Sequence, residues 1–231
     1  MALRSLQINH TAWNLRSLGE RAVILEPAAG DPELSEIHTI CHIIEGAGYE
    51  GLTDVIPTYK SIGLNFNEPI LDLDEISDQL ERITVKPERP ETKQRSVHVP
   101  VCYELGLDWE ELESHTGLEK DEIIRIHSEQ HYTVAMMGFI PGFLYLQGLN
   151  PKINCPRKSE PRTKVPKGAV GIGGNQAGIY SLESPGGWQI IGRTPLSFFK
   201  PNNDPPVTVG LGDKVIFERI SEDKFNEIER G

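Results

Sequence analysis

The chain has 231 residues, of which 38% are hydrophobic and 25% are charged, and its formal net charge is −11. This length suits one large domain or two modest ones, and we expect two. The acidic balance argues against general nucleic-acid binding, because phosphate contacts favour basic surfaces. No apolar run reaches the roughly 18 residues that a membrane span requires, and the N-terminus lacks the apolar core of a signal peptide. We therefore expect a cytoplasmic protein.

The first half of the sequence predicts alternating strands and helices. Residues 21–27, "RAVILEP", form a short apolar run typical of a strand. Asp31 and Pro32 then resemble an N-cap followed by proline at the first helical position, which predicts a helix to about Glu45. Its apolar residues recur at helical spacing, at Leu34, Ile37, Cys41 and Ile44.

Two strand-like pieces follow within residues 51–66, on either side of Pro57. A second helix is predicted from apolar residues that share one face, at Leu73, Ile76, Leu80 and Ile83. The sequence "ITVKP", residues 83–87, predicts a closing strand. The order strand, helix, strand, strand, helix, strand is that of the ferredoxin-like split βαβ arrangement.

Residues 86–96, "KPERPETKQRS", are polar and hold two prolines without periodicity, which is typical of a linker. Beyond it, residues 97–105 predict a strand, and residues 108–130 predict two short helices broken at Gly117. From Tyr132 onward, short apolar pieces separated by Gly and Pro predict an all-β barrel or sandwich. The expected fold class is α+β, with one domain at 1–88 and another at 96–231.

A cationic segment, residues 152–167, contains six positive residues and one negative residue, Glu160. The cations are Lys152, Arg157, Lys158, Arg162, Lys164 and Lys167. Such a local concentration in an acidic protein favours an anionic substrate or phosphate site, because Arg guanidiniums bind carboxylate and phosphate oxygens in pairs. A solvated loop is an equally good interpretation of the pattern.

Glycines are concentrated in "GIGGNQAG" (171–178) and "SPGGW" (184–188). They permit either close approach of a ligand to main-chain N–H groups or the turns and bulges of a barrel. Neither stretch matches the phosphate-binding G-x-x-x-x-G-K-[ST] pattern or a dinucleotide-binding G-x-G-x-x-G pattern. Spacing alone slightly favours the structural interpretation.

Histidine and cysteine give weaker signals. Cys41, Cys102 and Cys155 lie too far apart for a zinc motif, which favours reduced structural thiols. His38 and His42 have no third ligand nearby, so we expect surface residues and no metal site. His127 precedes the glycine-rich region and suits either an acid or base role or a packing role. No nucleophile elbow or close carboxylate pair appears.

Three linked motifs resemble the B-subunit family of bacterial 5-oxoprolinase. They are "GFIPGFLYLQGL" (138–149), "PRKSEPRTKVPKGAVGIGGNQAGIY" (156–180) and "SPGGWQIIGRTPLSFF" (184–199). That family also includes a sporulation kinase inhibitor and the first subunit of allophanate hydrolase. The resemblance implies a small α/β domain followed by a cyclophilin-like β-barrel. It also implies partners, the 5-oxoprolinase subunits C and A, that together open the lactam 5-oxoproline to L-glutamate with ATP.

The same resemblance supplies candidate site residues. Catalytic candidates are His127, Arg157 and Arg162, and substrate-binding candidates are Gln176, Tyr180, Trp188 and Arg193. We expect the two arginines to bind a small anionic substrate or intermediate without affecting folding. The alternatives are a non-enzymatic inhibitor of a sensor histidine kinase and an allophanate hydrolase or urea carboxylase type of subunit.

Overall fold

The computed structural model describes residues 3–8, 11–70, 72–82 and 95–230. The chain divides into two compact units, Met1–Lys93 and Gln94–Gly231. The predicted domain limits, 1–88 and 96–231, stay predictions. The predicted closing strand at 83–87 and most of the predicted linker lie outside the described residues.

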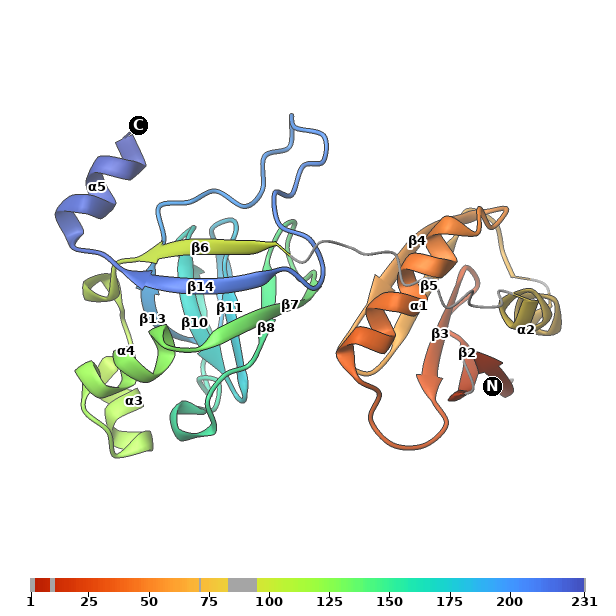
Figure 1. Ribbon diagram of the computed structural model, residues 1–231, viewed down its shortest axis with the longest axis horizontal. Helices are drawn as coiled ribbons and strands as arrows, with labels where there is room; N and C mark the ends of the chain where they lie inside the picture. The colour runs from red at the N-terminus through yellow and green to blue at the C-terminus, as the bar shows by residue number, and fades with distance from the viewer. Residues whose placement is uncertain (1–2, 9–10, 71, 83–94, 231) are drawn as a thin grey trace. The chain divides into compact units, whose positions relative to one another are not determined.

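In its described residues, the first unit contains one antiparallel sheet and two helices (Figure 1). Its elements are β1 Leu3–Ile8, β2 Thr11–Ser17, β3 Ala22–Pro27, α1 Leu34–Gly46, β4 Leu52–Pro57, β5 Ile62–Phe66 and α2 Leu73–Arg82. The sheet order is β1-β2-β3-β5-β4. Alternate residues of the central strands, such as Leu15, Leu25 and Leu64, point into one core together with the apolar faces of the helices.

This sheet differs from the predicted ferredoxin-like arrangement. The part β3-α1-β4-β5 has the expected split order, with β5 between β3 and β4. On the other side of β3, however, the partner is β2, with Leu15 opposite Leu25, and β1 follows as the edge strand. Neither β1 nor β2 is among the strands predicted from the sequence. A mixed α/β unit is therefore observed, and the ferredoxin-like assignment is not confirmed.

The first helix begins two residues later than predicted. Its N-cap is Glu33, and Leu34 is its first residue. Asp31 instead forms an ion pair with Lys60 at 2.7 Å, so it does not cap the helix. Pro32 lies in the extended connection, where its fixed φ is also compatible. The predicted apolar face is confirmed, since Leu34, Ile37, Cys41 and Ile44 are buried.

The second unit is built on a curled seven-stranded sheet, with β14 between β6 and β7 (Figure 1). Its order is β13-β10-β11-β8-β7-β14-β6. The strands are β6 Ser96–Val101, β7 His131–Met137, β8 Leu144–Gln147, β10 Ala169–Gly173, β11 Gln176–Ile179, β13 Gln189–Arg193 and β14 Lys214–Arg219. The pair β14 and β6 is parallel, and the other pairs are antiparallel.

Smaller elements complete this unit. They are the short helices η1 Tyr103–Leu105 and η2 Pro151–Ile153, the helices α3 Trp109–Thr116, α4 Lys120–Ser128 and α5 Glu222–Arg230, and a two-stranded ribbon of β9 Arg162–Val165 and β12 Ser184–Gly186. The break between α3 and α4 is at Gly117, as predicted, where φ is 70°.

The two edges of the curled sheet meet through the residue after β6. Cys102 N–H donates to Arg193 O at 2.8 Å, and Arg193 N–H donates to Cys102 O at 3.0 Å. The interior holds a core that includes Val99, Val134 and Ile172. A second, outer cluster lies against the other face of β8, β10 and β11, and it consists of Phe143, Val165, Ala169, Tyr180, Trp188 and Ile190.

Candidate functional site

The glycine-rich strands lie beneath the ring of Trp188. A Cβ added at Gly173 would lie 2.6 Å from that ring, and one at Gly178 would lie 2.9 Å from it. Side chains at these positions would displace the indole, which is itself only 5% exposed. The structure therefore explains the glycines of β10 and β11 by close packing, and the space that a nucleotide phosphate would need above them is filled.

A cluster of aromatic rings, most of them buried, extends from Trp188 along the outer face of this sheet. We call Phe143, Tyr145, Tyr180 and Trp188 the aromatic face. Their ring centroids lie 4.6 to 5.8 Å apart in tilted or edge-on contacts. Gln176 is half-buried, and it lies on the same side of β11 as Gly178 because side chains alternate along a strand. The predicted residues Gln176, Tyr180 and Trp188 are thus brought to one face.

Arg157 lies at the edge of the aromatic face. Its guanidinium carbon is 5.3 Å from the centre of the Trp188 ring, a cation–π geometry. Within the part of the chain that the structure describes, no acidic side chain forms an ion pair with Arg157. The charge of Arg157 is therefore available to an anionic ligand.

Arg162 and Lys158 have a different role, since both bind Asp108. This carboxylate is 2% exposed and lies at the N-cap of α3. Its Oδ1 accepts from the Arg162 guanidinium and from Lys158 Nζ at 3.1 Å, and its Oδ2 accepts from the Ile190 N–H at 2.6 Å. Burial by itself would raise the pKa of Asp108, but the Arg162 guanidinium and the Ile190 N–H hold that pKa below its ordinary value.

This arrangement does not favour the predicted role of Arg162. The sequence pattern predicts that both arginines contact an anionic ligand and are dispensable for folding. Arg162 instead neutralises a buried carboxylate, and it secures residues 155–162 against the start of α3. Arg157 and Arg162 are therefore not a converging pair.

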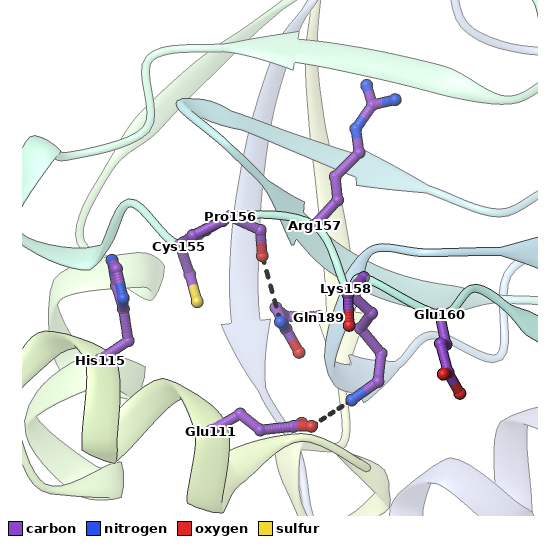
Figure 2. A pocket seen from close by; sticks show the side chains of 9 residues that line it. Glu111, His115, Cys155, Pro156, Arg157, Lys158, Glu160 and Gln189 are labelled. Carbon is purple, nitrogen blue, oxygen red and sulfur yellow. Dashed lines mark hydrogen bonds and ion pairs between the residues drawn. The ribbon is translucent and has the colours of Figure 1, made fainter.

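Two adjoining hollows flank the loop 155–160. The first has a volume of about 590 Å³ and is lined by Glu111, His115, Cys155, Pro156, Arg157, Lys158, Ser159, Glu160 and Gln189. The second, about 790 Å³, is lined by Leu107, Asp108, Glu110, Glu111, Ser114, His115, Lys158 and Arg162. Figure 2 shows Lys158 and Gln189 on the side of the loop that faces Glu111, while Arg157 extends in the opposite direction.

His127 is not at the mouth of this region. It is fully buried in the interior core, where its ring stacks on Phe217 with centroids 4.6 Å apart. Its Nδ1 shares a 2.8 Å hydrogen bond with the Tyr103 hydroxyl. Burial lowers the pKa of His127 to about 3, so the ring is neutral. This geometry does not favour the predicted acid or base role, and the contacts of the ring are those of the packing alternative.

Arg193 is also separate from the other candidates. Its guanidinium donates to Lys167 O at 3.2 Å and to Glu229 of α5 at 3.2 Å, and it lies over the Phe225 ring at 5.1 Å. These contacts attach the C-terminal helix to the sheet. Substrate binding by Arg193 is therefore not supported.

Sequence reasoning missed three residues of this site. Asp108 and Glu111 lie in "LDWEELES", which resembles an ordinary capped helix start, and Gln189 directly follows the conspicuous Trp188. A helix start gives no indication of which distant cations it will pair with.

Cys155 lines the first hollow and is 2% exposed. Burial raises the pKa of its thiol, which agrees with the expected inert thiol.

Among the described residues, no group of three His, Cys, Asp or Glu side chains is placed to hold a metal ion. Of the helices in the described ranges, none combines the length and apolar character of a membrane span.

Comparison with known proteins identifies the family of this chain. Residues 13–209 match the family model "Carboxyltransferase domain, subdomain C and D". The 5-oxoprolinase B-subunit of Bacillus subtilis is 35% identical over 93% of this chain and 95% of its own length. The chain belongs to the 5-oxoprolinase B-subunit family. The B-subunit of Escherichia coli O157:H7 is 37% identical over 87% of this chain and 93% of its own.

Solved structures show the same fold. The protein TTHA0988 matches with a TM-score of 0.74 and 30% identity over 87% of this chain, which spans 40% of the length of that protein. The urea amidolyase of K. lactis matches with a TM-score of 0.78 over the whole chain, which spans 16% of that protein, at 18% identity, a likeness of fold alone. This member of the B-subunit family is thus a mixed α/β protein with a curled sheet like that of urea carboxylase-type domains.

Proposed function

We propose that this chain is the B-subunit of an ATP-dependent 5-oxoprolinase, in which it helps to convert 5-oxo-L-proline to L-glutamate together with subunits A and C. The observation that carries this proposal is the match to named B-subunits over nearly the full length of both chains, with the cationic loop and the aromatic face present.

The residues of the loop suit a substrate that is anionic. The carboxylate of 5-oxoproline gives it one negative charge, and ATP supplies a phosphoryl group that turns the lactam oxygen into a leaving group. Arg157 presents an unneutralised guanidinium at the edge of the aromatic face. Asp108 holds the loop through Lys158 and Arg162, so the position of Arg157 is set before substrate arrives.

The chain does not offer a nucleotide site at its glycine-rich strands, because Trp188 occupies the space above Gly173 and Gly178. We therefore assign the use of ATP to the complex and derive no step with ATP on this chain. We also propose that the curled sheet is the cyclophilin-like barrel of the family. We propose as well that the protein is cytoplasmic, where ATP is available.

We infer that a partner chain completes the site, because the predicted acid or base, His127, is buried and neutral and does not line either hollow. Of the side chains that could exchange a proton in the hollows, Glu111 is already bound to Lys158, and His115 lies beside it on α3. We propose that the C-subunit supplies the missing groups against the open side of the hollows. The isolated chain should then release no glutamate from 5-oxoproline.

The test is reconstitution. This chain would be co-purified with candidate subunits A and C, and glutamate release would be measured with and without ATP. ATP-dependent turnover that requires all three chains supports the proposal. Turnover that is unchanged when this chain is omitted, or that this chain performs alone, contradicts it.

A second candidate, an inhibitor that binds a sensor histidine kinase, is favoured by one feature. Phe139 is 62% exposed and has a φ of 69°, an uncommon and strained conformation for a large side chain. An exposed aromatic residue held in this way suits a protein-binding surface. Loss of kinase autophosphorylation on addition of the chain would support this candidate, while an unaffected kinase would remove it.

A further inference from the structure

The hollow of about 590 Å³ contains a buried hydrogen-bond acceptor without a partner. Gln189 lines this hollow and is only 6% exposed. In the part of the chain that the structure describes, its Oε1 atom is buried and accepts no hydrogen bond. Buried polar atoms are nearly always satisfied, so an acceptor without a protein partner beside a hollow is a place where the donor of a ligand can bind.

The orientation of this amide is fixed by its other end. Gln189 Nε2 donates to the carbonyl of Pro156 at 3.1 Å. Because a carbonyl only accepts, the nitrogen must face Pro156 and the oxygen must face away from it. Figure 2 shows this bond, with the amide oxygen on the side of Glu111 and Lys158.

Lys158 supplies a donor on the same side of the loop. An ammonium group has three N–H donors. Two of them have partners, Asp108 Oδ1 at 3.1 Å and Glu111 Oε1. The third has no partner among the described residues. An acceptor and a donor therefore line one hollow, which Arg157 also lines, although its side chain extends away from Glu111 (Figure 2).

A lactam has the complementary edge. Its ring forces the amide into the cis form, so the N–H and the C=O lie side by side. We propose that Gln189 and Lys158 form an amide-recognition subsite, in which Gln189 Oε1 accepts the ring N–H and Lys158 Nζ donates to the ring carbonyl. This inference rests on the proposed function and assigns its specificity for a cyclic amide to these two residues.

The same pair discriminates against a close analogue of the ring. An N-methylated lactam has no donor for Gln189 and places a methyl group against a buried polar atom. It should therefore bind more weakly than the lactam that keeps its N–H.

The experiment uses the full chain and two small probes, 2-pyrrolidone and N-methyl-2-pyrrolidone, with binding followed by ligand-observed NMR. We expect the N–H lactam to bind with a Kd at least about tenfold lower than that of its N-methyl analogue. Equal affinities, or no binding of 2-pyrrolidone to the wild-type chain, would overturn the inference. This comparison needs no variant, so it does not depend on the folding of one.

Variants then assign the contact. Gln189→Met and Lys158→Met should each reduce 2-pyrrolidone binding about tenfold, with Gln147→Met, an exposed glutamine at the end of β8, as the matched control. Melting temperatures identify any variant that fails to fold. If folded Gln189→Met protein binds 2-pyrrolidone as tightly as wild type, the assignment to Gln189 is wrong.

The reconstituted enzyme separates this inference from the proposed function. In an active complex, Gln189→Met should raise KM for 5-oxoproline about tenfold and change kcat less. An active wild-type complex with an unchanged KM for the variant would retain the function and remove the subsite. An inactive wild-type complex would remove the function, while the two-probe comparison would still decide the subsite.

Discussion

At the scale of single residues, Arg157 and Arg162 have opposite surroundings although each follows a proline. Arg162 is paired with a carboxylate that is 2% exposed, while Arg157 lies over an indole ring at 5.3 Å. An arginine that neutralises a buried acid is needed for folding, and an arginine without an acidic partner can serve a ligand. Arg157 is thus the better catalytic candidate of the two.

We expect Arg157→Ala to lower glutamate release by the reconstituted enzyme by at least about 30-fold, or about 2 kcal/mol, because a charge-assisted contact to an anion is lost. Stability should fall by less than about 1 kcal/mol, the magnitude of an exposed cation–π contact. Arg157→Lys should recover activity only in part. Arg230→Ala, which removes an exposed arginine of α5, serves as the control. Normal turnover by Arg157→Ala would remove this residue from the site.

His127 gives the protein a pH-dependent stability. Its pKa falls from an ordinary value of 6.5 to about 3 in the folded state because burial disfavours the charged ring. Below pH 6.5 the unfolded chain takes up a proton that the folded chain does not. The stabilising contribution is therefore complete above the ordinary pKa and is lost as the pH falls towards the folded-state pKa, by about 1.4 kcal/mol per pH unit.

Urea unfolding between about pH 4 and pH 7 would measure this effect. His127→Gln removes the titrating ring, so the free energy of unfolding of this variant should depend less steeply on pH than that of the wild type. His115→Gln, at an exposed histidine, should keep the wild-type slope. Parallel slopes for wild type and His127→Gln would show that His127 does not titrate in this way.

At the scale of elements, the glycines of β10 and β11 and the ring of Trp188 form one packed layer. Gly173→Ala places a Cβ 2.6 Å from the indole, and overpacking of this kind costs about 1–3 kcal/mol. Gly138 lies in the same signature but has open space around its Cβ position, so Gly138→Ala should change stability by less than about 0.5 kcal/mol. Thermal unfolding of both variants tests this. Equal melting temperatures would mean that the Trp188 layer is not tightly packed.

Local patterns are sufficient to predict most elements. The apolar face of α1, the break at Gly117 and the β-rich character after Tyr132 each depend on neighbours in sequence, and each is observed. The strands β1 and β2 are not predicted because each buries only two alternating residues, Leu6 and Ile8 in β1 and Trp13 and Leu15 in β2, which is too short a pattern to stand out in the sequence. The pairing of β2 with β3 is what displaces the ferredoxin-like arrangement.

The site itself is only partly predictable. Motif resemblance identifies Arg157, Gln176, Tyr180 and Trp188, which the structure brings to one face. It cannot separate them from His127 or Arg193, because a motif records residue types and not which way the side chains point. The ion pair of Arg162 with Asp108 joins residues 54 positions apart, so no local pattern could indicate it.

At the scale of the whole molecule, each unit has a hydrophobic core of its own. The first unit's core includes Trp13, and the second unit's core includes Tyr132. Separate cores predict that each unit can fold without the other. The predicted linker, 86–96, provides a place to test this.

Limited trypsin digestion should cut first after Lys93, because the bonds after Lys86 and Arg89 precede prolines and resist trypsin. The fragment from Gln94 should then resist further digestion and show a cooperative melting transition of its own. A first cut within residues 138–192 would contradict the proposed division of the chain. Mass spectrometry of the earliest fragments distinguishes the two outcomes.

The ion pairs of Asp108 with Lys158 and Arg162 have a consequence for the energetics of ligand binding. Because Lys158 and Arg162 are bound to a buried carboxylate, the loop between them has lost much of its conformational entropy when the chain folds. A substrate that enters the hollow therefore does not have to order the loop, and more of its contact energy remains as affinity. The loop is therefore preorganised by folding. A substitution that weakens the ion pairs of Asp108 should lower the affinity for a ligand before it lowers anything else.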